Sequence, residues 1–543
     1  MPYSKTPQVS TYETKRVHFN LNPQQRSLIA GQDFRLTNLM VEILKNGSGE
    51  EPRYSLINRP GLATWITQSA GQGRGIYYWP KTNTVFYAIG NVLYAGFSPV
   101  LTLANSTGAV GFAEHINNVA QNTLNIFDGI HGYVFTDNSN YTRIIPNTWT
   151  ASTVTTLGTP RSPTVANGHA YDCTTAGTTG ATEPTWTTTV GGTTTDGTVT
   201  WTCREMAFPT PHTPQPVFMD GYMFLAKAGT ADIYNCDLNY PLKWSAGNYI
   251  TCEMYPGNVV ALTKNNNYVY AVCDQSIQYF YDAANPTGTP LANRPEAVLQ
   301  FGTPAPETVT PTENEVILVG QTGNGQYTVW KIDGFKAKEI STPPICNALT
   351  LEAYTYGISA IQGMTAQCLR IVGQKLYLLF LTDKTLVYDF TTDMWSEWLG
   401  PGDGAFDAAY GTDNLNTYPF LLGKSNGYVY TMRPFIYTDA GHPYNCTVTT
   451  PKLDFDTINR KTMSRFSLIG DTQTSDSSLQ TMTISWSDDD YNTWISRDLQ
   501  FTSDLPSIHQ LGRFRRRAFK ITTAQPLPFR LDGIEVDINK GTI

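Results

Sequence analysis

Charged residues are scarce in this chain of 543 residues, where Asp, Glu, Lys and Arg together make up 15%. The 37 Lys and Arg are outnumbered by 45 Asp and Glu, and the net charge of −8 is spread along the chain. A general nucleic-acid binder needs a basic surface, so the composition argues against that class of protein. It is compatible with a surface to which DNA does not adhere.

Long apolar runs are also missing. No segment approaches about 18 uninterrupted apolar residues, and the N-terminal MPYSKTPQVSTYETKR has no apolar stretch after its first charges. We therefore expect neither a signal peptide nor a membrane span.

The eight cysteines form no Cys-x-x-Cys pair, so no zinc site or thioredoxin-like redox site has its spacing here. In a chain without a signal peptide, scattered cysteines are expected to be buried free thiols, and Cys173 and Cys203 are the one pair to test for a disulfide. The seven histidines never occur at two-, three- or four-residue spacing. We expect no metal site, no catalytic residue and no cofactor.

Strand and turn residues are plentiful: Tyr, Thr, Gly, Asn and Pro predict an all-β protein. Hairpins of two aromatic strands around a Gly/Asn/Asp turn recur, as in TVFYAIGNVLYAG at 84–96 and YPFLLGKSNGYVYTM at 418–432. They start about 40 to 60 residues apart once one insertion is set aside, which is the spacing of four-stranded propeller blades. We predict a six- or seven-bladed β-propeller. The alternative is a series of sandwich domains with unrelated hairpins.

Three further regions flank or interrupt this propeller. Residues 1–60 lack a regular period and contain Asn, Gln and Pro breaks, which predicts an extended N-terminal arm. A Thr/Gly-rich stretch almost without charge, 160–205, is predicted to be a small inserted β module, and longer alternating strands over 441–543 predict a C-terminal β-sandwich. The propeller then occupies 61–159 and 206–440.

The stretch SDDDYNTW at 487–494 raises the question of metal or sugar chemistry. As a calcium loop it lacks the turn glycine and the closing glutamate, so a calcium site is rejected. The Ser-x-Asp-x-x-x-Thr-Trp frame of the sialidase Asp box is present at Ser487, Asp489, Thr493 and Trp494, with Tyr491 in place of the usual glycine. We predict a structural turn in which the aspartate is the cap and the tryptophan packs beneath.

Two glycine motifs lack the local structure that their chemistry requires. GKSNG at 423–427 has strands on both sides instead of the strand-to-helix turn of a nucleophile elbow. GQTGNG at 320–325 lacks the following helix of a phosphate-binding loop. Both are predicted to be turns.

The one dense basic segment is LGRFRRRAFK at 511–520. On a strand, Arg513, Arg515 and Arg517 would project to one face and Arg516 to the other. A solvated face is one interpretation. The alternatives are salt bridges to an acidic neighbouring subunit and transient contact with DNA phosphates.

The insertion resembles the short G-x-x-E-P-x-W and D-G-T-V-x-W modules of many phage virion proteins. The matching residues are Gly180, Glu183, Pro184, Trp186, Asp196, Gly197, Thr198, Val199 and Trp201. Trp186 and Trp201 are candidate glycan contacts. The alternative is that both fill the small core of the module.

Several segments together resemble the tail nozzle, or packaged-DNA stabilisation, proteins of short-tailed bacteriophages. Over 35–62 the matching residues are Asn38, Glu42, Pro60, Gly61 and Leu62. Over 218–244 they are Asp220, Gly221, Tyr222, Gly229, Thr230, Tyr234, Asp237, Leu238, Asn239, Pro241 and Trp244, while Cys236 replaces a serine. ISTPPI at 340–345, YDFTTDMWSEW at 388–398 and the C-terminal SWSDDDYNTW and LGRFRRRAFKI also fit. The resemblance runs nearly end to end apart from the insertion.

The resemblance implies a structural virion protein of the tail, assembled in the host bacterial cytoplasm, and not an enzyme. It implies a hexameric ring below the portal and its adaptor that closes the DNA-filled capsid. A central channel would let double-stranded DNA leave, and outer surfaces would anchor tail fibres or spikes.

The alternative function is a propeller protein that binds or degrades host glycans, such as a sialidase-like protein or a tail depolymerase. That chemistry needs paired carboxylates, or a tyrosine nucleophile with an arginine cluster. The sequence alone does not assemble such a set.

Overall fold

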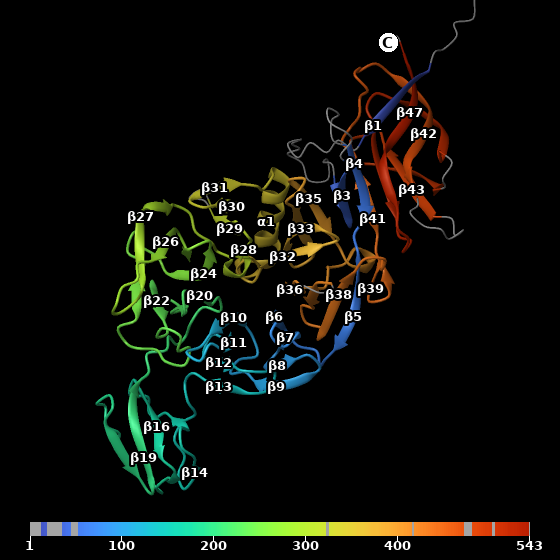
Figure 1. The fold of residues 1–543 in the computed structure, drawn as a ribbon. Coiled ribbons are helices and arrows are strands. Elements are labelled where there is room, and N and C mark those ends of the chain that lie inside the picture. Colours follow the sequence, from blue (N-terminus) through green and yellow to red (C-terminus); the bar gives the residue numbers. More distant parts are fainter. Residues whose placement is uncertain are drawn as a thin grey trace, which may run out of the picture.

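The computed structural model describes residues 12–18, 35–44, 53–321, 325–414, 418–471, 480–501 and 505–541. In this part of the chain β-strands dominate, as predicted. Figure 1 shows an elongated molecule in which the propeller lies between the C-terminal sandwich at one end and the inserted module at the other.

Seven four-stranded antiparallel arrays surround one axis among the described residues, so the propeller has seven blades. The innermost strand of each blade contacts that of the next, and the seventh contacts the first, which closes the ring. From inner to outer strand, blades one to three are β6 (Gly73–Trp79), β7 (Thr84–Ile89), β8 (Val92–Ala95), β9 (Ser98–Thr102); β10 (Gly111–Ile116), β11 (Asn122–Phe127), β12 (Gly132–Phe135), β13 (Tyr141–Arg143); and β20 (Val217–Met219), β21 (Tyr222–Ala226), β22 (Asp232–Asn235), β23 (Tyr249–Thr251).

The remaining blades follow the same order of strands. Blades four and five are β24 (Val259–Asn265), β25 (Tyr268–Cys273), β26 (Ile277–Asp282), β27 (Leu291–Leu299); and β28 (Thr310–Pro311), β29 (Glu315–Gln321), β30 (Tyr327–Asp333), β31 (Lys336–Glu339). Blades six and seven are β32 (Thr365–Ile371), β33 (Gln374–Phe380), β34 (Thr385–Asp389), β35 (Met394–Trp398); and β36 (Tyr410–Thr412), β37 (Phe420–Leu422), β38 (Tyr428–Arg433), β5 (Gly61–Thr67).

Strand β7 illustrates why the middle strands are apolar runs. Phe86 and Ala88 belong to the apolar cluster shared with blade two, whereas Val85, Tyr87 and Ile89 belong to the cluster shared with blade seven. Both faces of a blade are covered by neighbouring blades, so side chains that alternate between the faces are all buried. This packing explains why apolar hairpins recur in the sequence.

The two ends of the propeller sequence meet in blade seven. β5 pairs antiparallel with β38, from Gly61 opposite Arg433 to Thr67 opposite Tyr428. The early strand thereby completes the last blade and closes the ring with backbone hydrogen bonds.

A nine-stranded sheet joins blade six to the sandwich. β2 (Arg35–Thr37) lies between β35, which it pairs with in parallel, and β41 (Cys446–Thr449), which it pairs with antiparallel. The sheet continues through β46 (Ala518–Thr523), β43 (Gln480–Ser487) and β44 (Ile495–Phe501).

The second sheet of the sandwich recruits strands from both ends of the chain. Its order is β3 (Leu39–Leu44), β4 (Arg53–Asn58), β47 (Arg530–Lys540), β42 (Lys461–Asp471) and β45 (Ser507–Phe514), with β1 (Glu13–His18) also paired to β47. Phe466, Trp486 and Ile534 are among the buried residues of the core between the sheets. The described parts of the predicted arm are therefore extended and pack on the C-terminal region, while 1–11, 19–34 and 45–52 lie outside the described residues.

The inserted module leaves the propeller after β13 and returns before β20. Its strands are β15 (Pro160–Arg161), β16 (His169–Thr175), β19 (Val199–Glu205) and β18 (Thr193–Asp196) in one sheet, and β14 (Val154–Thr155) and β17 (Gly177–Thr178) in a second pair. β14 begins at Val154, before the predicted start of the module at 160. The domain boundaries drawn from the sequence remain predictions.

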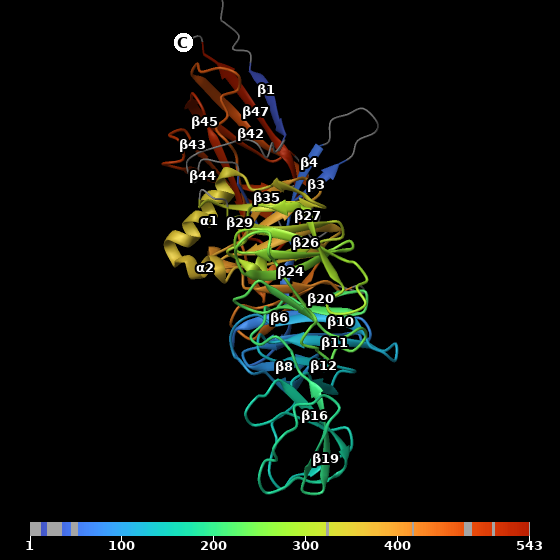
Figure 2. The same cartoon turned by 90° about the vertical axis from the view of Figure 1, so that its left-hand side faces the viewer.

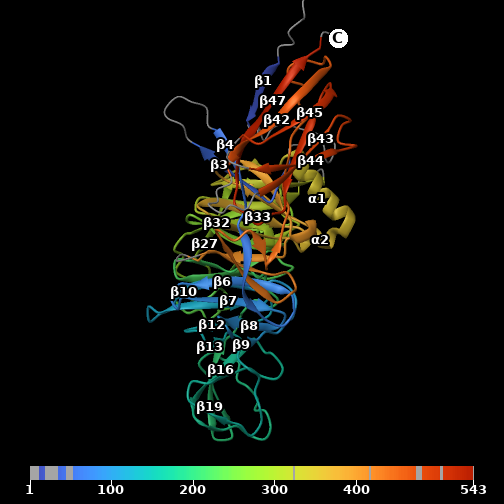
Figure 3. The ribbon, with the colours of Figure 1, turned by 90° about the vertical axis from the view of Figure 1, so that its right-hand side faces the viewer.

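Two helices between blades five and six were not predicted. α1 (Pro343–Tyr356) and α2 (Ile358–Gln362) lie at one flat face of the propeller (Figures 2 and 3). ISTPPI, assigned to the blades by resemblance, leads into α1, whose first turn contains two prolines that need no N–H partner there. No helix of the described residues is long and apolar enough to cross a membrane.

Short elements complete the fold: 3-10 helices η1 (Pro306–Thr308) and η2 (Pro401–Asp403), and the strand pair β39 (Thr438–Asp439) and β40 (His442–Pro443). η1 precedes blade five, whereas β39 lies beside β5 at the junction with the sandwich.

Candidate functional site

Arg59 lies at the junction of the propeller and the sandwich, between β4 and β5, and is fully buried. Its Nη2 donates to Asp439 Oδ2 at 2.6 Å and its Nη1 to Oδ1 at 3.0 Å. Nε donates to the Asn38 side chain at 2.9 Å, and the carbonyls of Pro60 and Leu399 each accept at 3.0 Å. Every N–H of the guanidinium is therefore used.

Aromatic rings enclose this ion pair. The guanidinium carbon of Arg59 lies 3.8 Å from the ring centroid of Tyr444 and 4.9 Å from that of Phe406. Burial opposes the charged form of Arg59, but the Asp439 carboxylate outweighs it and the pKa of Arg59 is raised. Burial also raises the pKa of Tyr444, whose O–H donates to the Arg59 carbonyl. Arg59 therefore keeps its charge inside an apolar enclosure.

Asn38 and Gly61 bring the backbone segments of the junction into contact. Asn38, at a φ of 56°, donates its N–H to Glu397 O at 2.8 Å, and its Oδ1 also accepts from Leu399 N at 2.9 Å. A Cβ on Gly61 would lie 2.2 Å from Thr438 O, so only glycine allows this approach. These residues connect blade six, blade seven and the sandwich.

The SDDDYNTW stretch forms the turn between β43 and β44. Asp489 Oδ1 accepts from Thr493 N and from Ser487 Oγ, both at 2.9 Å, and Oδ2 accepts from Thr493 Oγ1 at 2.5 Å. The donors of Thr493 and Ser487 lower the pKa of Asp489 to about 2. Trp494 is half-buried, with the Lys520 ammonium 4.7 Å from its ring centroid.

Tyr491 has a φ of 72°, at the position where the Asp-box frame usually has glycine. A side chain in this conformation is strained, and here its contacts offset the strain. Its N–H donates to Ser487 Oγ at 3.0 Å and its O–H to Thr450 O at 3.1 Å. The turn is thus attached to the strand that precedes it and to the segment after β41.

The other two aspartates of the turn are partners of the basic segment. Arg517 is 1% exposed in its side chain and donates from Nε and Nη2 to the two carboxylate oxygens of Asp488, each at 2.7 Å. Arg516 Nη2 donates to Asp490 Oδ2 at 2.8 Å, and Lys452 Nζ lies 2.9 Å from Asp490 Oδ1. Both motifs that stand out in the sequence therefore meet in one intramolecular charge cluster.

The expectation that the basic segment is one strand is wrong. β45 ends at Phe514, the chain bends at Arg515 and Arg516, and β46 begins at Ala518 in the other sheet of the sandwich. This crossing buries Arg517 and leaves Arg513 and Arg515 exposed. A subunit or DNA contact by Arg513, Arg515, Arg516 or Arg517 stays a prediction.

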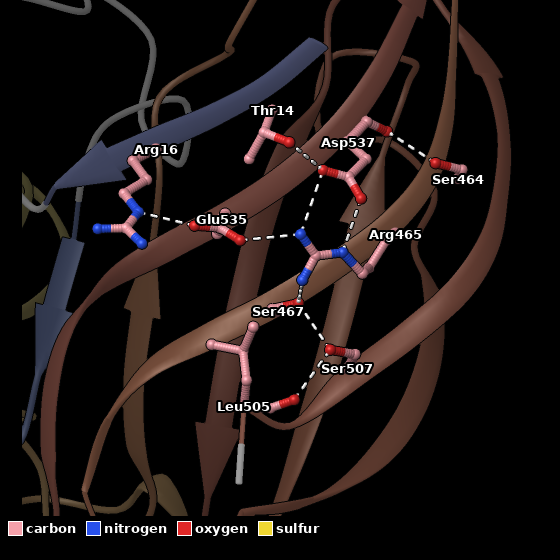
Figure 4. A network of polar contacts seen from close by, with 9 residues as sticks. All are labelled: Thr14, Arg16, Ser464, Arg465, Ser467, Leu505, Ser507, Glu535 and Asp537. Carbon is pink, nitrogen blue, oxygen red and sulfur yellow. Dashed lines mark hydrogen bonds and ion pairs between the residues drawn. The ribbon is translucent and has the colours of Figure 1, made fainter. Parts of the chain in front are cut away.

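An ionic network attaches β1 to the sandwich (Figure 4). Arg465 on β42 donates from Nε to Asp537 Oδ2 at 2.7 Å and from Nη2 to Glu535 Oε1 at 2.8 Å. From β1, Arg16 Nε donates to Glu535 Oε2 and Thr14 Oγ1 to Asp537 Oδ1, both at 2.7 Å. These donors lower the pKa of both carboxyls: Arg16 and Arg465 that of Glu535, and Arg465 that of Asp537.

Trp186 and Trp201 both pack in the inserted module. Trp201 is 0% exposed and donates from Nε1 to Asp196 Oδ2 at 3.0 Å. Trp186 is half-buried, 4.2 Å from Tyr171 between ring centroids, and donates to Glu183 Oε1 at 2.8 Å. Stacking of a sugar on Trp201 would require the core to open. Glycan contact stays a prediction, with Trp186 the more accessible of the two.

Comparison with known proteins places these features in a family. A family model described as "Bacteriophage P22 Gp10, beta-propeller" matches residues 33–399, more than half of the chain. The chain belongs to this family. It is a P22 Gp10-like phage stabilisation protein, a component of the phage tail.

The solved structures to which the chain is similar include three of low sequence identity. The β-propeller domain of Myceliophteria thermophila Cps50 (Swd1) is 7% identical with a TM-score of 0.29, over 68% of this chain and 100% of that chain. PorZ of Porphyromonas gingivalis is 9% identical with a TM-score of 0.36, over 80% and 46%. YCF48 bound to D1 peptide is 11% identical with a TM-score of 0.28, over 69% and 98%. No curated protein matches the chain.

The family match begins just before β2 and ends just after β35, so it includes Asn38 and Arg59 but not Asp439. Sequence reasoning named Asn38 and Gly61 as family residues but missed Arg59, which lies between them. An arginine in NRPGL directly before a strand is the only local signal. Asp439 offers no signal, because its partner is far away in the sequence.

The remaining candidate motifs lie in turns or outside the described residues. Ser425 lies in the turn between β37 and β38, whereas 322–324 of GQTGNG lie outside the described residues. All eight cysteines are free thiols, and Cys173 and Cys203 occupy diagonal positions on β16 and β19. Within the described ranges, no three His, Cys, Asp or Glu residues are grouped as metal ligands would be.

Proposed function

We propose that this chain is the subunit of a hexameric tail nozzle below the portal and its adaptor. The ring closes the DNA-filled capsid, forms the channel through which double-stranded DNA leaves, and anchors tail fibres or spikes on its outer surface. The observation that carries this proposal is membership of the P22 Gp10-like family over residues 33–399. Its location is then the virion tail, after assembly in the host bacterial cytoplasm.

The junction around Arg59 supports a role in which the subunit bears load. A nozzle on a filled capsid experiences force along its wall, so independent motion of the propeller and the sandwich would weaken it. Here the two parts share the nine-stranded sheet through β2, and a saturated buried ion pair lies beside that sheet. Backbone pairing across both parts suits one stiff subunit.

The charge of the chain supports passage of DNA without retention. A net charge of −8 gives no long-range attraction for phosphates, and DNA can move past a surface that does not bind it. We propose that the protein acts on DNA as a conduit only.

We also propose that the protein is not an enzyme. The three aspartates of SDDDYNTW are engaged in structural contacts: Asp488 with Arg517, Asp489 with Thr493, and Asp490 with Arg516 and Lys452. A glycosidase would need a carboxylate pair directed at a substrate, and these carboxylates are directed at the protein itself.

The test is electron microscopy of the purified chain mixed with a portal–adaptor complex. A six-fold ring that continues the portal channel is expected. A chain that stays monomeric or trimeric beside its portal would count against the proposal, and release of reducing sugars from host polysaccharide would favour the glycan-degrading alternative.

A charge-reversal pair tests whether the exposed arginines contribute to the ring. Arg513→Glu with Arg515→Glu is expected to weaken ring formation if they contact an acidic neighbour, and Lys336→Glu with Lys338→Glu on exposed β31 is the matched control. If the rings form normally and only DNA release changes, the arginines contact DNA instead.

A further inference from the structure

A cavity lies on the axis of the propeller, at the face that carries α2. Its volume is about 690 Å³, and each of the seven blades contributes to its wall where the inner strand begins or where a turn approaches the axis. Small-molecule sites typically measure about 300–1,000 Å³, so this cavity has the size of a ligand pocket. It lies within one chain and is separate from the channel proposed for the ring.

Glu307 is the acidic side chain in this wall. It lies in η1, directly before blade five, and remains partly accessible from the cavity. Gln215 Nε2 donates to its Oε1 at 2.6 Å, and among the described residues no cation forms an ion pair with it. Burial, opposed by the Gln215 hydrogen bond, raises the pKa of Glu307 to about 7. A carboxylate in this position is therefore short of positive charge.

The cation that lines the same cavity is committed elsewhere. Lys424 Nζ donates to the carbonyls of Leu381 and Thr382, and the carboxylates that raise its pKa against burial are Glu352, Asp407 and Asp383. Glu307 is not among them. Within the part of the chain that the structure describes, the cavity therefore has a carboxylate without an ion-pair partner and an ammonium that donates to two backbone carbonyls.

The rest of the wall is mainly apolar but also includes the polar side chains of Gln72, His212, Gln362, Thr365, Thr382 and Tyr410. Among the described residues, the buried His212 Nε2 has no hydrogen-bond partner. Val259, Met364 and Phe380 are among the apolar lining residues. Thr213 also lines the cavity, is 6% exposed, and its Oγ1 has no hydrogen-bond partner among the described residues. Buried polar groups of this kind are normally satisfied by a partner or a ligand.

The geometry points to a binding site for a small organic cation, an ammonium or guanidinium group on an apolar stem. The charged group pairs with the Glu307 carboxylate, the Thr213 hydroxyl is available as an additional acceptor, and the stem packs on the apolar wall. The cation has two possible sources, a free alkylamine or the side chain of a Lys or Arg from another protein. This inference does not depend on the proposed tail function.

Calorimetry on the full-length chain tests the site with matched probes at about pH 8, where Glu307 is charged. n-Butylammonium should bind, and n-butanol, which has the same stem without the charge, should bind about tenfold more weakly or not at all. Equal binding of the two probes, or binding of neither, would overturn the inference. N-acetyl-lysine-N-methylamide distinguishes the sources: binding admits a protein side chain, and failure restricts the site to free amines.

Two variants locate the site. Glu307→Gln should reduce n-butylammonium affinity about tenfold, whereas Glu296→Gln, an exposed glutamate on β27, should leave it within about twofold. If Glu307→Gln does not fold, the methyl resonance of Met364 in the wild-type chain provides a second measurement. It should shift on addition of n-butylammonium, and an unchanged Met364 resonance would overturn the placement in the axial cavity.

Discussion

Arg59 and Glu307 are both charged groups enclosed by the protein, but their surroundings differ. Arg59 donates to five acceptors, including both oxygens of Asp439, and lies against aromatic rings. Among the described residues, Glu307 has a single side-chain hydrogen bond, from Gln215, and it faces a cavity. The first charge is fully compensated within the chain, whereas the second is not.

This difference indicates a structural role for Arg59 and a binding role for Glu307. A buried ion pair with every donor used fixes the relative position of the segments that supply it, because moving any of them exposes an unpaired charge to an apolar medium. A buried charge without an ionic partner lowers the stability of the fold, and a ligand that supplies the opposite charge offsets part of that loss. The junction around Arg59 therefore has a structural role, whereas a ligand is expected in the axial cavity.

Removing the charge of Arg59 should lower the free energy of unfolding more than the other substitutions proposed below. Arg59→Ala leaves the Asp439 carboxylate buried and unpaired, which costs about 3–5 kcal/mol. The midpoint of denaturant unfolding measures this loss. Arg513→Ala, at an exposed arginine of the same chain, should change stability by less than about 0.5 kcal/mol. Equal effects of the two substitutions would show that the junction is not the structural connection described above.

Substitution of two adjacent arginines in the sandwich should lower stability by different amounts, because one is buried and the other is exposed. Arg517→Ala should destabilise by about 1.5–3 kcal/mol, since it removes a buried bidentate contact with Asp488. Arg516→Ala breaks a solvent-exposed pair with Asp490 and should cost under about 1 kcal/mol. Urea unfolding of both variants measures the difference, and a larger loss for Arg516 would contradict the placement of these side chains.

Acid should weaken the attachment of β1. The pKa values of Glu535 and Asp537 are lowered in the folded state, so their contribution to stability is complete above their unfolded pKa values and is lost as pH falls through the folded ones. Arg465→Met should cost about 1–2 kcal/mol near neutral pH and make the acid dependence shallower. Unfolding midpoints at about pH 7 and pH 3 test this. Parallel pH curves for the two proteins would refute it.

The axial carboxyl of Glu307 should show the opposite pH dependence. Because the folded pKa of Glu307 is raised to about 7, the folded state binds the extra proton between about pH 4.5 and 7. Glu307 therefore lowers the free energy of unfolding as pH rises through this window, and the contribution levels off above it. Glu307→Gln should remove this part of the pH curve, and Glu296→Gln should retain it. An unchanged curve in Glu307→Gln would mean that Glu307 has an ordinary pKa.

The propeller blades were predictable because the sequence signals that define them lie within short segments. Each hairpin is defined by aromatic strands around a short turn, and the spacing of the hairpins indicates blades. The helix α1 was missed, although the two prolines after Thr342 and Gly357 at its end are ordinary boundary signals. Its apolar residues are spread around the helix instead of gathering on one face, so the helical period is weak.

The charged sites were less predictable, because their partners are distant in the sequence. SDDDYNTW was interpreted as a turn from its own residues, and Asp489 bonds to Thr493 and Ser487 a few positions away. The basic segment was misjudged, because nothing local reveals that the chain changes sheets after Phe514 and directs Arg517 at Asp488. The burial of Trp201 likewise has no local signal in the sequence, because it depends on the packing of several strands of the module.

The sequence by itself determined the all-β class, the propeller architecture, the turn chemistry and the family. These follow from patterns within a few dozen residues, where apolar spacing and turn residues act directly on the backbone. Only the tertiary structure decided the closure of blade seven by β5, the shared sheet through β2, the Arg59–Asp439 pair and the isolation of Glu307. Each of these depends on which distant segments lie side by side. Strand pairing and the energy of a buried charge are both determined by neighbours in space, which can be far away in the sequence.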